Sequence, residues 1–403
     1  MTTSQKLSDV LQFIRGVTFS PEELVTGDEP GAIACLRTKN IQKELDDSDL
    51  IYVPSSVVKR EEQALQECDL LISSANSWGL VGKTVRVGKL SYPATAGGFI
   101  SILRPDRERI DPDYLFRFIS WARTQHEIRH LGRQTTNISN LDRERFLELP
   151  IPLPPLPTQR HIAKVLEQAD SLRRQAQQME AEFDRLAQAL FRDMFGDYRQ
   201  QAAKNFVPLA KVADVVSGVA KGGKLTGAVR SLPYLRVANV QDGFLNLSEI
   251  KKIEATERDI EKYRLKAGDI LMTEGGDFDK LGRGAMWSGE IAECIHQNHI
   301  FRVRLSDAYE PRFFECYLRT PMVKTYFLGC AKKTTNLASI NMSQLKALPT
   351  PKESLGRQKQ FVVALQKIEA QRQMARRQQV ELEQAFQSLT QRAFKGELTP
   401  KLA

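Results

Sequence analysis

The chain has 403 residues, of which 41% are hydrophobic and 27% charged, a balance that excludes a disordered or membrane-embedded protein. No apolar run approaches the roughly 18 residues of a membrane-spanning helix, and the N-terminus lacks the layout of a signal peptide, so we expect a cytoplasmic protein. The net charge of +9 favours a polyanionic partner such as a nucleic acid. The five cysteines form no C-x-x-C pair, which indicates reduced thiols rather than disulfides or a structural zinc site.

Residues 1–155 are expected to form a first mixed α/β domain. Short apolar segments bounded by turn-forming residues predict strands at 34–41, 68–75 and 97–105. Residues 111–131 predict a helix with Asp111 as its N-cap and Pro112 at its first position. Five prolines within 149–159 exclude a helix there and predict a stiff, extended connector.

A long amphipathic helix is predicted to begin just beyond this connector and to end near Gly196, within a central coiled-coil region at 156–197. Its apolar and small residues recur at alternating spacings of four and three, which is the heptad pattern of a helix that pairs with another helix. The predicted pairing positions are Val165, Ala169, Leu172, Ala176, Met179, Phe183, Leu186 and Leu190.

The second half of the chain repeats the first. LPIPLPPLPTQR at 149–160 returns as LPTPKESLGRQK at 348–359, and CLRTKNI at 35–41 returns as YLRVANV at 234–240. We therefore predict a second mixed α/β domain at 198–351 and a second coiled-coil region at 352–403. The pairing positions assigned to its helix are Ile368, Ala375, Leu382 and Leu389.

The predicted pairing positions of each helix form a seam along it. The seam of the second helix carries Gln371 and Gln378 where that of the first has Leu172 and Met179. These glutamines either specify the register of the coil as buried polar residues or mark a stretch where the coil is imperfect or faces a partner. The order of domain, helix, domain, helix requires antiparallel pairing if the two seams meet. The predicted fold is therefore α+β, an internal pseudo-two-fold duplication in which two antiparallel helices of about 60 Å separate two similar domains.

The segment SWGLVGKT at 77–84 resembles the end of a phosphate-binding loop. Ser77 replaces the first glycine of that motif, and the copy at 277–284 has no lysine-threonine pair, so nucleotide binding is not predicted. The turn instead presents basic residues in both copies, either for phosphate or base-edge contacts or as a solvated hairpin tip. These residues are Lys83 and Arg86 in the first copy and Lys280 and Arg283 in the second.

Two loops with a shared Thr-Thr-Asn core are further candidates for nucleic-acid contact. Their Arg, Lys, Gln, Thr and Asn side chains are types that bind phosphates and read base edges, although the threonines also suit a backbone-satisfying connection. The candidates are Arg133, Gln134, Thr135, Thr136, Asn137, Lys332, Lys333, Thr334, Thr335 and Asn336.

Cys294, His296 and His299 have the spacing of metal ligands, but a fourth ligand and equivalents in the first copy are missing. We interpret them as structural residues and predict no metal site. The chain also lacks the common hydrolase, metalloprotease and dinucleotide-binding motifs and the N-P-P-aromatic motif of adenine methyltransferases. No catalytic residue is predicted, and the chain is not expected to be an enzyme on its own.

These features resemble the DNA-specificity subunit of type I restriction-modification systems over essentially the whole chain. The most specific match is LPIPLPPLPTQRHIAKVLEQADSLRR at 149–174, with a fainter copy at 348–370. Thr158 replaces the acidic residue usual before Gln159, and the second copy has lost the P-L-P-P run.

The resemblance implies a non-catalytic subunit that reads a bipartite, asymmetric double-stranded DNA target, with the helices setting the gap between half-sites. It also implies two modification subunits, which methylate adenine from S-adenosylmethionine, and restriction subunits that use ATP and Mg. No cofactor is expected in this chain. The alternatives are a scaffold or DNA mimic that binds the modification subunits without reading DNA, and the recognition half of a fused restriction enzyme. A mimic would be acidic, whereas this chain carries +9.

Overall fold

The computed structural model describes residues 4–134, 138–220, 222, 227–276, 281–333 and 338–398. The chain divides into two compact units, the first formed by 1–177 with 377–403 and the second by 178–376. This division passes through the middle of both long helices. The helical regions expected at 156–197 and 352–403 are therefore each shared between the two units.

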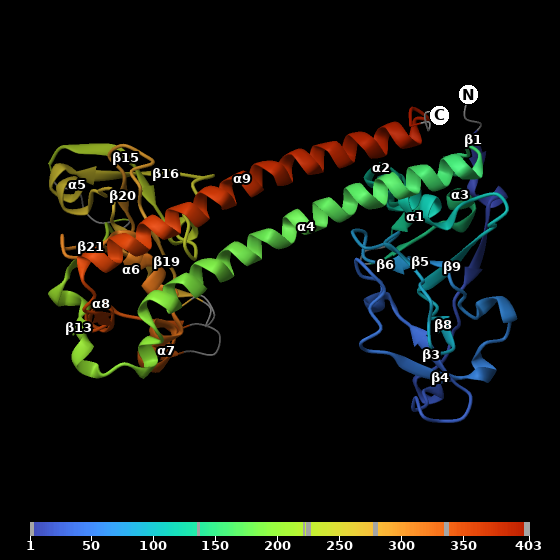
Figure 1. Ribbon diagram of the computed structural model, residues 1–403, viewed down its shortest axis with the longest axis horizontal. Coiled ribbons are helices and arrows are strands. Elements are labelled where there is room, and N and C mark those ends of the chain that lie inside the picture. The colour runs from blue at the N-terminus through green and yellow to red at the C-terminus, as the bar shows by residue number, and fades with distance from the viewer. Residues whose placement is uncertain are drawn as a thin grey trace. The chain divides into compact units, whose positions relative to one another are not determined.

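The first unit is mixed α/β and is built around a four-stranded antiparallel sheet of order β2-β9-β5-β7 (Figure 1). A second sheet has the order β4-β3-β8, with β3 and β8 parallel. A small sheet β10-β11-β6 and the pair β1-β12 complete the unit. The strands are β1 Ser4–Lys6, β2 Leu11–Arg15, β3 Ala32–Leu36, β4 Ile51–Pro54, β5 Leu70–Ser73, β6 Ala75–Asn76, β7 Thr84–Arg86, β8 Ala94–Ala96, β9 Ile100–Pro105, β10 Arg133–Gln134, β11 Ser139–Asn140 and β12 Pro150–Pro152.

The helix predicted over 111–131 is two helices, α1 Pro112–Ser120 and α2 Ala122–Leu131. Trp121 lies between them with extended dihedral angles, φ −61° and ψ 133°, which end α1 and act as the N-cap of α2. The predicted cap is confirmed, because the Asp111 carboxylate accepts hydrogen bonds from the backbone N–H groups of Asp113 and Tyr114. A short helix, α3 Arg143–Leu147, precedes the proline-rich stretch, whose first part is extended and contributes β12. The exclusion of a helix from 149–159 is wrong at 156–159, because α4 begins at Leu156 and accommodates Pro157 in its first turn.

The sheets of the second unit have the corresponding strand orders, β14-β21-β17-β19, β16-β15-β20, β18-β23-β22 and β13-β24. Its strands are β13 Phe206–Pro208, β14 Ala213–Ser217, β15 Val229–Leu235, β16 Lys251–Thr256, β17 Ile270–Thr273, β18 Gly275–Gly276, β19 Gly284–Met286, β20 Ile295–His296, β21 Ile300–Leu305, β22 Lys332–Lys333, β23 Ala338–Ser339 and β24 Pro349–Pro351. Its short helices are α5 Glu257–Tyr263, α6 Pro311–Leu318, α7 Pro321–Cys330 and α8 Met342–Lys346.

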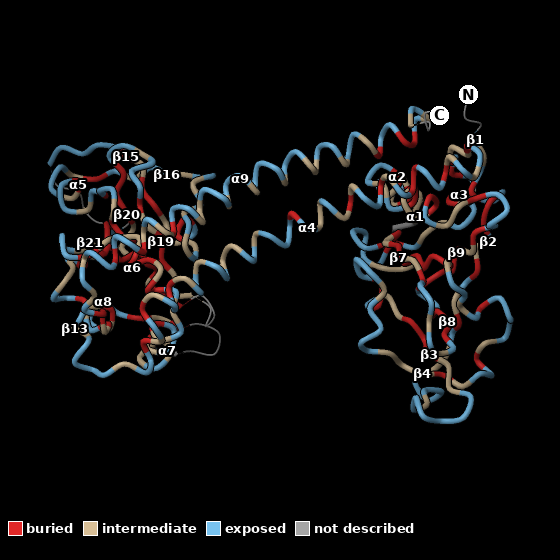
Figure 2. The backbone as a smooth tube through the Cα atoms, viewed as in Figure 1, coloured by how far each residue is buried: buried red, intermediate tan, exposed pale blue. Residues whose placement is uncertain are grey.

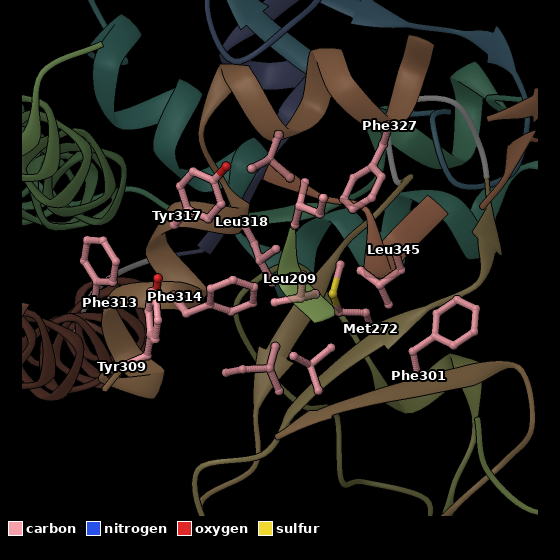
Figure 3. Close-up of a cluster of buried hydrophobic side chains, with 14 of the residues drawn as sticks. Leu209, Met272, Phe301, Tyr309, Phe313, Phe314, Tyr317, Leu318, Phe327 and Leu345 are labelled. Atoms are coloured by element: carbon pink, nitrogen blue, oxygen red, sulfur yellow. The ribbon is translucent and has the colours of Figure 1, made fainter. Parts of the chain in front are cut away.

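The core of the second unit forms where α6 and α7 cover the four-stranded sheet. Phe314 and Phe327 project from the helices towards Met272 of β17 and Phe301 of β21 (Figure 3). All four side chains are buried, and burial of one such side chain stabilises the fold by about 1.5–3 kcal/mol. Figure 2 shows that buried residues concentrate in the globular parts, whereas the middle stretches of both long helices are largely exposed.

Each long helix begins with a buried glutamine that holds it to the globular part of its unit. In α4 Leu156–Phe195, the Gln159 amide donates to the carbonyl oxygens of Arg109 and Pro154, and its Oε1 accepts from the Asp111 N–H. In α9 Leu355–Phe394, Gln358 makes the corresponding three hydrogen bonds, with Ala308, Glu353 and Glu310. Each helix is therefore anchored at its start by a buried amide whose hydrogen-bonding groups are all satisfied.

Each long helix ends on an aromatic contact. Phe394, at the end of α9, packs against Tyr114 of α1 in the first unit, with ring centroids 5.4 Å apart. Phe195, at the end of α4, packs against Phe313 of α6 in the second unit, with centroids 4.9 Å apart. Each globular part thus holds the beginning of one long helix and the end of the other.

The predicted long helix and its end near Gly196 are confirmed, but the predicted buried seam is wrong at three positions. Leu172, Met179 and Leu186 are 53%, 43% and 51% exposed. An α-helix turns about 20° per heptad away from a strict seven-residue repeat, so the contact stripe drifts off these positions. Ala176 is buried, and the remaining pairing positions are partly buried, namely Val165, Ala169, Phe183, Leu190, Ile368, Ala375, Leu382 and Leu389.

Ion pairs replace apolar contacts in the middle of the helix pair. In the first unit Arg173 of α4 lies 3.1 Å from Glu383 of α9, and in the second unit Arg372 of α9 lies 3.1 Å from Asp184 of α4. The two arginines, and likewise the two carboxylates, are 199 positions apart, from 173 to 372 and from 184 to 383, so the contact is made twice in equivalent form.

Gln371 and Gln378 are exposed, so they do not specify register as buried polar residues. The alternative interpretation, an imperfect coil or a stretch that faces a partner, is the one compatible with this exposure. No helix in the described part of the chain, these two included, is long and apolar enough to cross a bilayer.

Replacing Gln159 with Ala is expected to destabilise the protein by about 2–4 kcal/mol, because it leaves two buried carbonyls and one N–H without partners. Urea unfolding of the full chain measures this loss. Hydrogen exchange of the peptide around Asp111 should report local opening. The matched control is Gln175→Ala, at an exposed position of the same helix. Equal stability of the two variants would show that the buried glutamine is dispensable.

Candidate nucleic-acid interface

A small three-stranded sheet brings two of the predicted DNA-contacting segments together. Asn76 of β6 pairs with Ser139 of β11, and β11 pairs in turn with β10. Strands β10 and β11 flank the first Thr-Thr-Asn loop, and the glycine turn at 77–82 follows β6 directly. In the second unit, Gly276 of β18 pairs with Ala338 of β23 in the same way. Segments about 60 residues apart in the sequence thus lie side by side in each unit.

The centres of both Thr-Thr-Asn loops lie outside the described residues, and the structure leaves those predictions untested. Of three flanking residues, Arg133, Gln134 and Lys333, the structure describes the backbone in β10 and β22, and Lys332 is exposed. The candidates outside the described residues are Thr135, Thr136, Asn137, Lys280, Thr334, Thr335 and Asn336.

The last glycine of the turn has a left-handed backbone in both units. Gly82 has φ +84° and Gly282 has φ +72°, a left-handed conformation that favours glycine. A Cβ atom at Gly82 would lie 2.6 Å from Cγ2 of Ile128, and one at Gly282 would collide with the ring of Phe327. The turn leads into strands β7 and β19 rather than into a helix, so the resemblance to a phosphate-binding loop ends there.

The residue after this glycine is basic in both units and lies beside a glutamine from a separate loop. Lys83 Nζ is 2.9 Å from Oε1 of Gln42, and Arg283 Nη1 is 3.2 Å from Oε1 of Gln241. Sequence reasoning had singled out the cations but not the glutamines. The internal repeat could have identified the glutamines, because Gln42 and Gln241 directly follow the matched segments 35–41 and 234–240.

Arg86 is placed differently from Lys83. Its Nε lies 2.9 Å from the Asp113 carboxylate of α1, and its Nη2 donates to Sγ of Cys68 at 3.3 Å. Burial raises the pKa of Asp113, and this effect outweighs the neighbouring Arg86 charge, which lowers it. The counterpart of Arg86 in the second copy is Met286. Arg86 therefore serves contacts within its own unit, and the structure favours Lys83 as the contact residue of the turn.

An aromatic and basic cluster next to the first turn was not predicted. Trp78, 42% exposed, lies under the Arg129 guanidinium at 5.8 Å and meets the ring of His130 edge-on at 5.8 Å. Both Arg129 and His130 are on α2, so helix spacing brings them to the turn only once the fold is known. Such pairing of an exposed aromatic ring with a cation is a contact type found at nucleic-acid surfaces.

A charged cleft of about 1050 Å³ opens in the first unit between the loop that carries Gln42, helix α1 and the two long helices. Several of its charged side chains pair with one another. Asp170 lies 2.9 Å from Arg117 and 2.7 Å from Arg173. Burial is the largest influence on the pKa of Asp170 and raises it, but hydrogen bonds and charges from these arginines outweigh burial and hold the pKa below its usual range. The cleft is therefore an ion-pair network that fastens α1 to the long helices.

The candidate metal ligands do not converge. His296 is buried, with Nδ1 3.0 Å from the carbonyl oxygen of Ile300, whereas His299 is exposed and pairs with Glu274 at 2.7 Å. No group of three or more His, Cys, Asp or Glu in the described ranges could hold a metal ion. This geometry supports the interpretation of His296 and His299 as structural residues.

Comparison with known proteins identifies the class to which this fold and interface belong. A family model described as the type I restriction modification DNA specificity domain matches residues 2–181. The type I restriction enzyme EcoKI specificity subunit of Escherichia coli K12 is 26% identical over 98% of this chain and 88% of its own length. The StySPI specificity subunit of Salmonella potsdam is 27% identical, with the same coverage.

Solved structures share the fold. A chain from a study of complex assembly and conformational transition of the type I restriction-modification system superposes with a TM-score of 0.64 at 17% identity, covering 98% of both chains. The type I restriction-modification S subunit from M. genitalium superposes with a TM-score of 0.51 at 14% identity, covering 97% of this chain and 96% of its own.

The chain is similar to a class of DNA-specificity subunits, through a family model over residues 2–181 and through relatives over 98% of its length. The relatives that match nearly the whole chain are specificity subunits of type I restriction enzymes. Members of this family recognise DNA sequence, and catalysis resides in the partner subunits. These comparisons bear out the prediction of a type I specificity subunit whose catalysis lies in partner subunits.

The buried His296 predicts a pH dependence of the second unit. Burial lowers the pKa of His296 to about 4 from an ordinary value of 6.5, so the unfolded chain takes up this proton at a higher pH than the folded one. The contribution of neutral His296 to the free energy of unfolding is fully present above pH 6.5. It is lost as the pH drops towards 4, by up to about 3 kcal/mol. Urea unfolding at a series of pH values should show this fall in the wild type. The fall should be much smaller in His296→Gln, and an unchanged pH dependence in that variant would contradict the assignment.

Proposed function

We propose that this chain reads a bipartite, asymmetric sequence in double-stranded DNA, with one half-site for each globular part. The observation that supports this most directly is that the same arrangement of residues recurs in both units with different side chains. In both units a cation follows the turn glycine and lies beside a glutamine from an earlier loop, but the cation is Lys83 in one and Arg283 in the other. Two equivalent backbone arrangements that carry different side chains are suited to two different half-sites.

We propose that the paired helices α4 and α9 act as the spacer between the half-sites. A helix of 40 residues extends about 60 Å. Glutamine at its start and phenylalanine at its end dock each helix on globular parts, and the repeated arginine–carboxylate pairs join the two helices along their length. Such docking would transmit a defined separation from the helices to the two reading surfaces.

The proposed partners follow from the family and from the exposed surface of the helices. Two modification subunits, using S-adenosylmethionine, would methylate adenine in the target, and restriction subunits would add ATP- and Mg-dependent translocation and cleavage. This chain would direct them to the sequence without a cofactor of its own. The exposed Leu172, Met179 and Leu186 are seven residues apart and leave an apolar stripe on α4 for such assembly. The alternative of a DNA mimic finds no support in a chain that carries +9.

Reversing the charge at Lys83 should affect one half-site only. Lys83→Glu, in the full chain assembled with its modification subunits, is expected to weaken binding to the intact target about tenfold or more. It should also remove the penalty for scrambling one half of the probe while keeping the penalty for the other half. Titrations on probes scrambled in each half measure both effects.

Lys89→Glu is the matched control, because Lys89 is an exposed lysine near the same turn. Arg86→Glu is expected instead to destabilise the first unit, since it would place a carboxylate beside Asp113. If Lys83→Glu made both halves of the probe equally insensitive, the assignment of one half-site to each unit would be refuted.

Lengthening both helices should lengthen the unread gap. One heptad inserted after Gln177 and one after Arg376 adds about 10 Å while preserving the pairing within each half. At about 3.4 Å per base pair, the preferred gap should grow by about three base pairs. Selection of bound sequences from probes with gaps of different length measures the shift. An unchanged gap preference in a folded variant would show that the helices do not set the spacing.

A further inference from the structure

The basic turn of each unit meets a glutamine from a loop about 40 residues earlier in the chain, and we call each set a donor–acceptor pair. The first pair is Lys83 with Gln42, and the second is Arg283 with Gln241. The two pairs occupy equivalent places, because Gln42 precedes Lys83 by 41 residues and Gln241 precedes Arg283 by 42. The contact is present in both copies although the cation is lysine in one and arginine in the other. This recurrence indicates that the contact is a shared feature of the two units and not an accidental one.

The glutamine amide has a fixed orientation in both pairs. Gln42 Nε2 donates to the carbonyl oxygen of Lys39 at 2.7 Å, and Gln241 Nε2 donates to the carbonyl oxygen of Ala238 at 2.8 Å. A carbonyl can only accept, so the nitrogen of each amide faces the backbone and Oε1 faces the cation. Each pair therefore presents one acceptor oxygen next to a positively charged donor.

The loop that carries each glutamine is organised by a buried asparagine. Asn40 is 1% exposed, and its Nδ2 donates to the carbonyl oxygens of Asp46 and Asp49 at 2.7 and 3.2 Å. Asn239 is 3% exposed and bonds in the same way to Asn246 and Glu249, at 2.8 and 3.1 Å. Both loops thus hold their glutamine with little freedom, which lowers the entropy lost when a ligand binds.

Each loop is also fastened to a neighbouring element of its own unit. Glu44 lies 3.2 Å from Arg174 of α4, and the Gly243 N–H donates to the carbonyl oxygen of Gly284 in β19 at 2.9 Å. The cations stand on turns whose left-handed glycines permit one close-packed geometry. Gln42 is exposed, while Lys83, Arg283 and Gln241 are partly exposed, so the pairs remain accessible to a ligand.

The chemistry of such a pair matches one edge of one base pair. In the major groove, guanine offers the acceptors N7 and O6, and its partner cytosine offers the N4 amino donor beside them. A cation that donates to guanine next to an oxygen that accepts from cytosine complements that edge. An A·T pair presents adenine N7 and N6 with thymine O4, so its donor lies between two acceptors and matches the pair less well.

We propose that each donor–acceptor pair reads one G·C base pair in the major groove, so that Gln42 and Gln241 are specificity-determining residues. This inference rests on the proposed function and adds to it a named base pair in each half-site. Arg283 can form two parallel hydrogen bonds to guanine, whereas Lys83 is a single point charge. The G·C requirement is therefore stricter in the half-site read by the second unit.

The test is selection of bound sequences from a DNA library by the full chain assembled with its modification subunits. The wild type is expected to select a bipartite motif with a G·C pair in each half. Gln42→Ala should reduce the discrimination at one such position about tenfold, and Gln241→Ala should do so at one position in the other half. The matched control is Gln66→Ala, at an exposed glutamine of the first unit outside the loop.

Lys83→Met serves as a second probe of the first pair, should Gln42→Ala disturb its loop. It is expected to relax the same position as Gln42→Ala. A uniform loss of affinity over all sequences, or an unchanged motif in these variants, would overturn the inference while leaving the proposed function in place. A wild type that selects no motif would instead refute the proposed function itself.

Discussion

Docking of the two long helices onto the globular parts is the interaction on which the rest of this structure depends. A buried glutamine begins each helix with three hydrogen bonds, and a phenylalanine ends each helix in an aromatic contact. Either feature alone would leave the helix free to pivot about one end. Together they leave each globular part held by the beginning of one helix and the end of the other, which a spacer of defined length requires.

The middle of the helix pair is held by charge rather than by apolar packing. Arg173 with Glu383, and Arg372 with Asp184, are partly exposed pairs, so each contributes modestly to stability. Their value lies in register, because an arginine opposite a carboxylate disfavours a slipped alignment that would bring like charges together. The apolar residues that an ordinary coiled coil would bury, such as Leu172 and Met179, are left on the surface.

Much of the fold could be predicted from sequence because its signals are local or repeated. The end of α4, the cap at Asp111 and the extended first part of the proline-rich stretch follow from short-range sterics and hydrogen bonding. The break at Trp121 and the drift of the seam could not be predicted, because tertiary packing decides both. A heptad pattern identifies the face of a helix that packs against a partner. It does not show where along that face ion pairs replace apolar packing.

Some features of the candidate interface could likewise be predicted from sequence, and others could not. Basic residues on a glycine turn were visible in the sequence, and Lys83 and Arg283 occupy equivalent positions, each beside a glutamine. The ion pair of Arg86 with Asp113 depends on a helix that packs beside the strand, so sequence could not distinguish Arg86 from Lys83. The glutamine partners come from a loop about 40 residues away, and the fold alone shows that they meet the cations.

The central claim is that one chain reads two unlike half-sites across a fixed gap. Mapping methylated adenines by single-molecule sequencing of DNA from cells that express this chain with its modification subunits tests it most directly. The account predicts a single asymmetric motif of two short specified segments separated by a constant number of unspecified base pairs. A continuous motif, a palindromic motif, or two segments at variable spacing would contradict it.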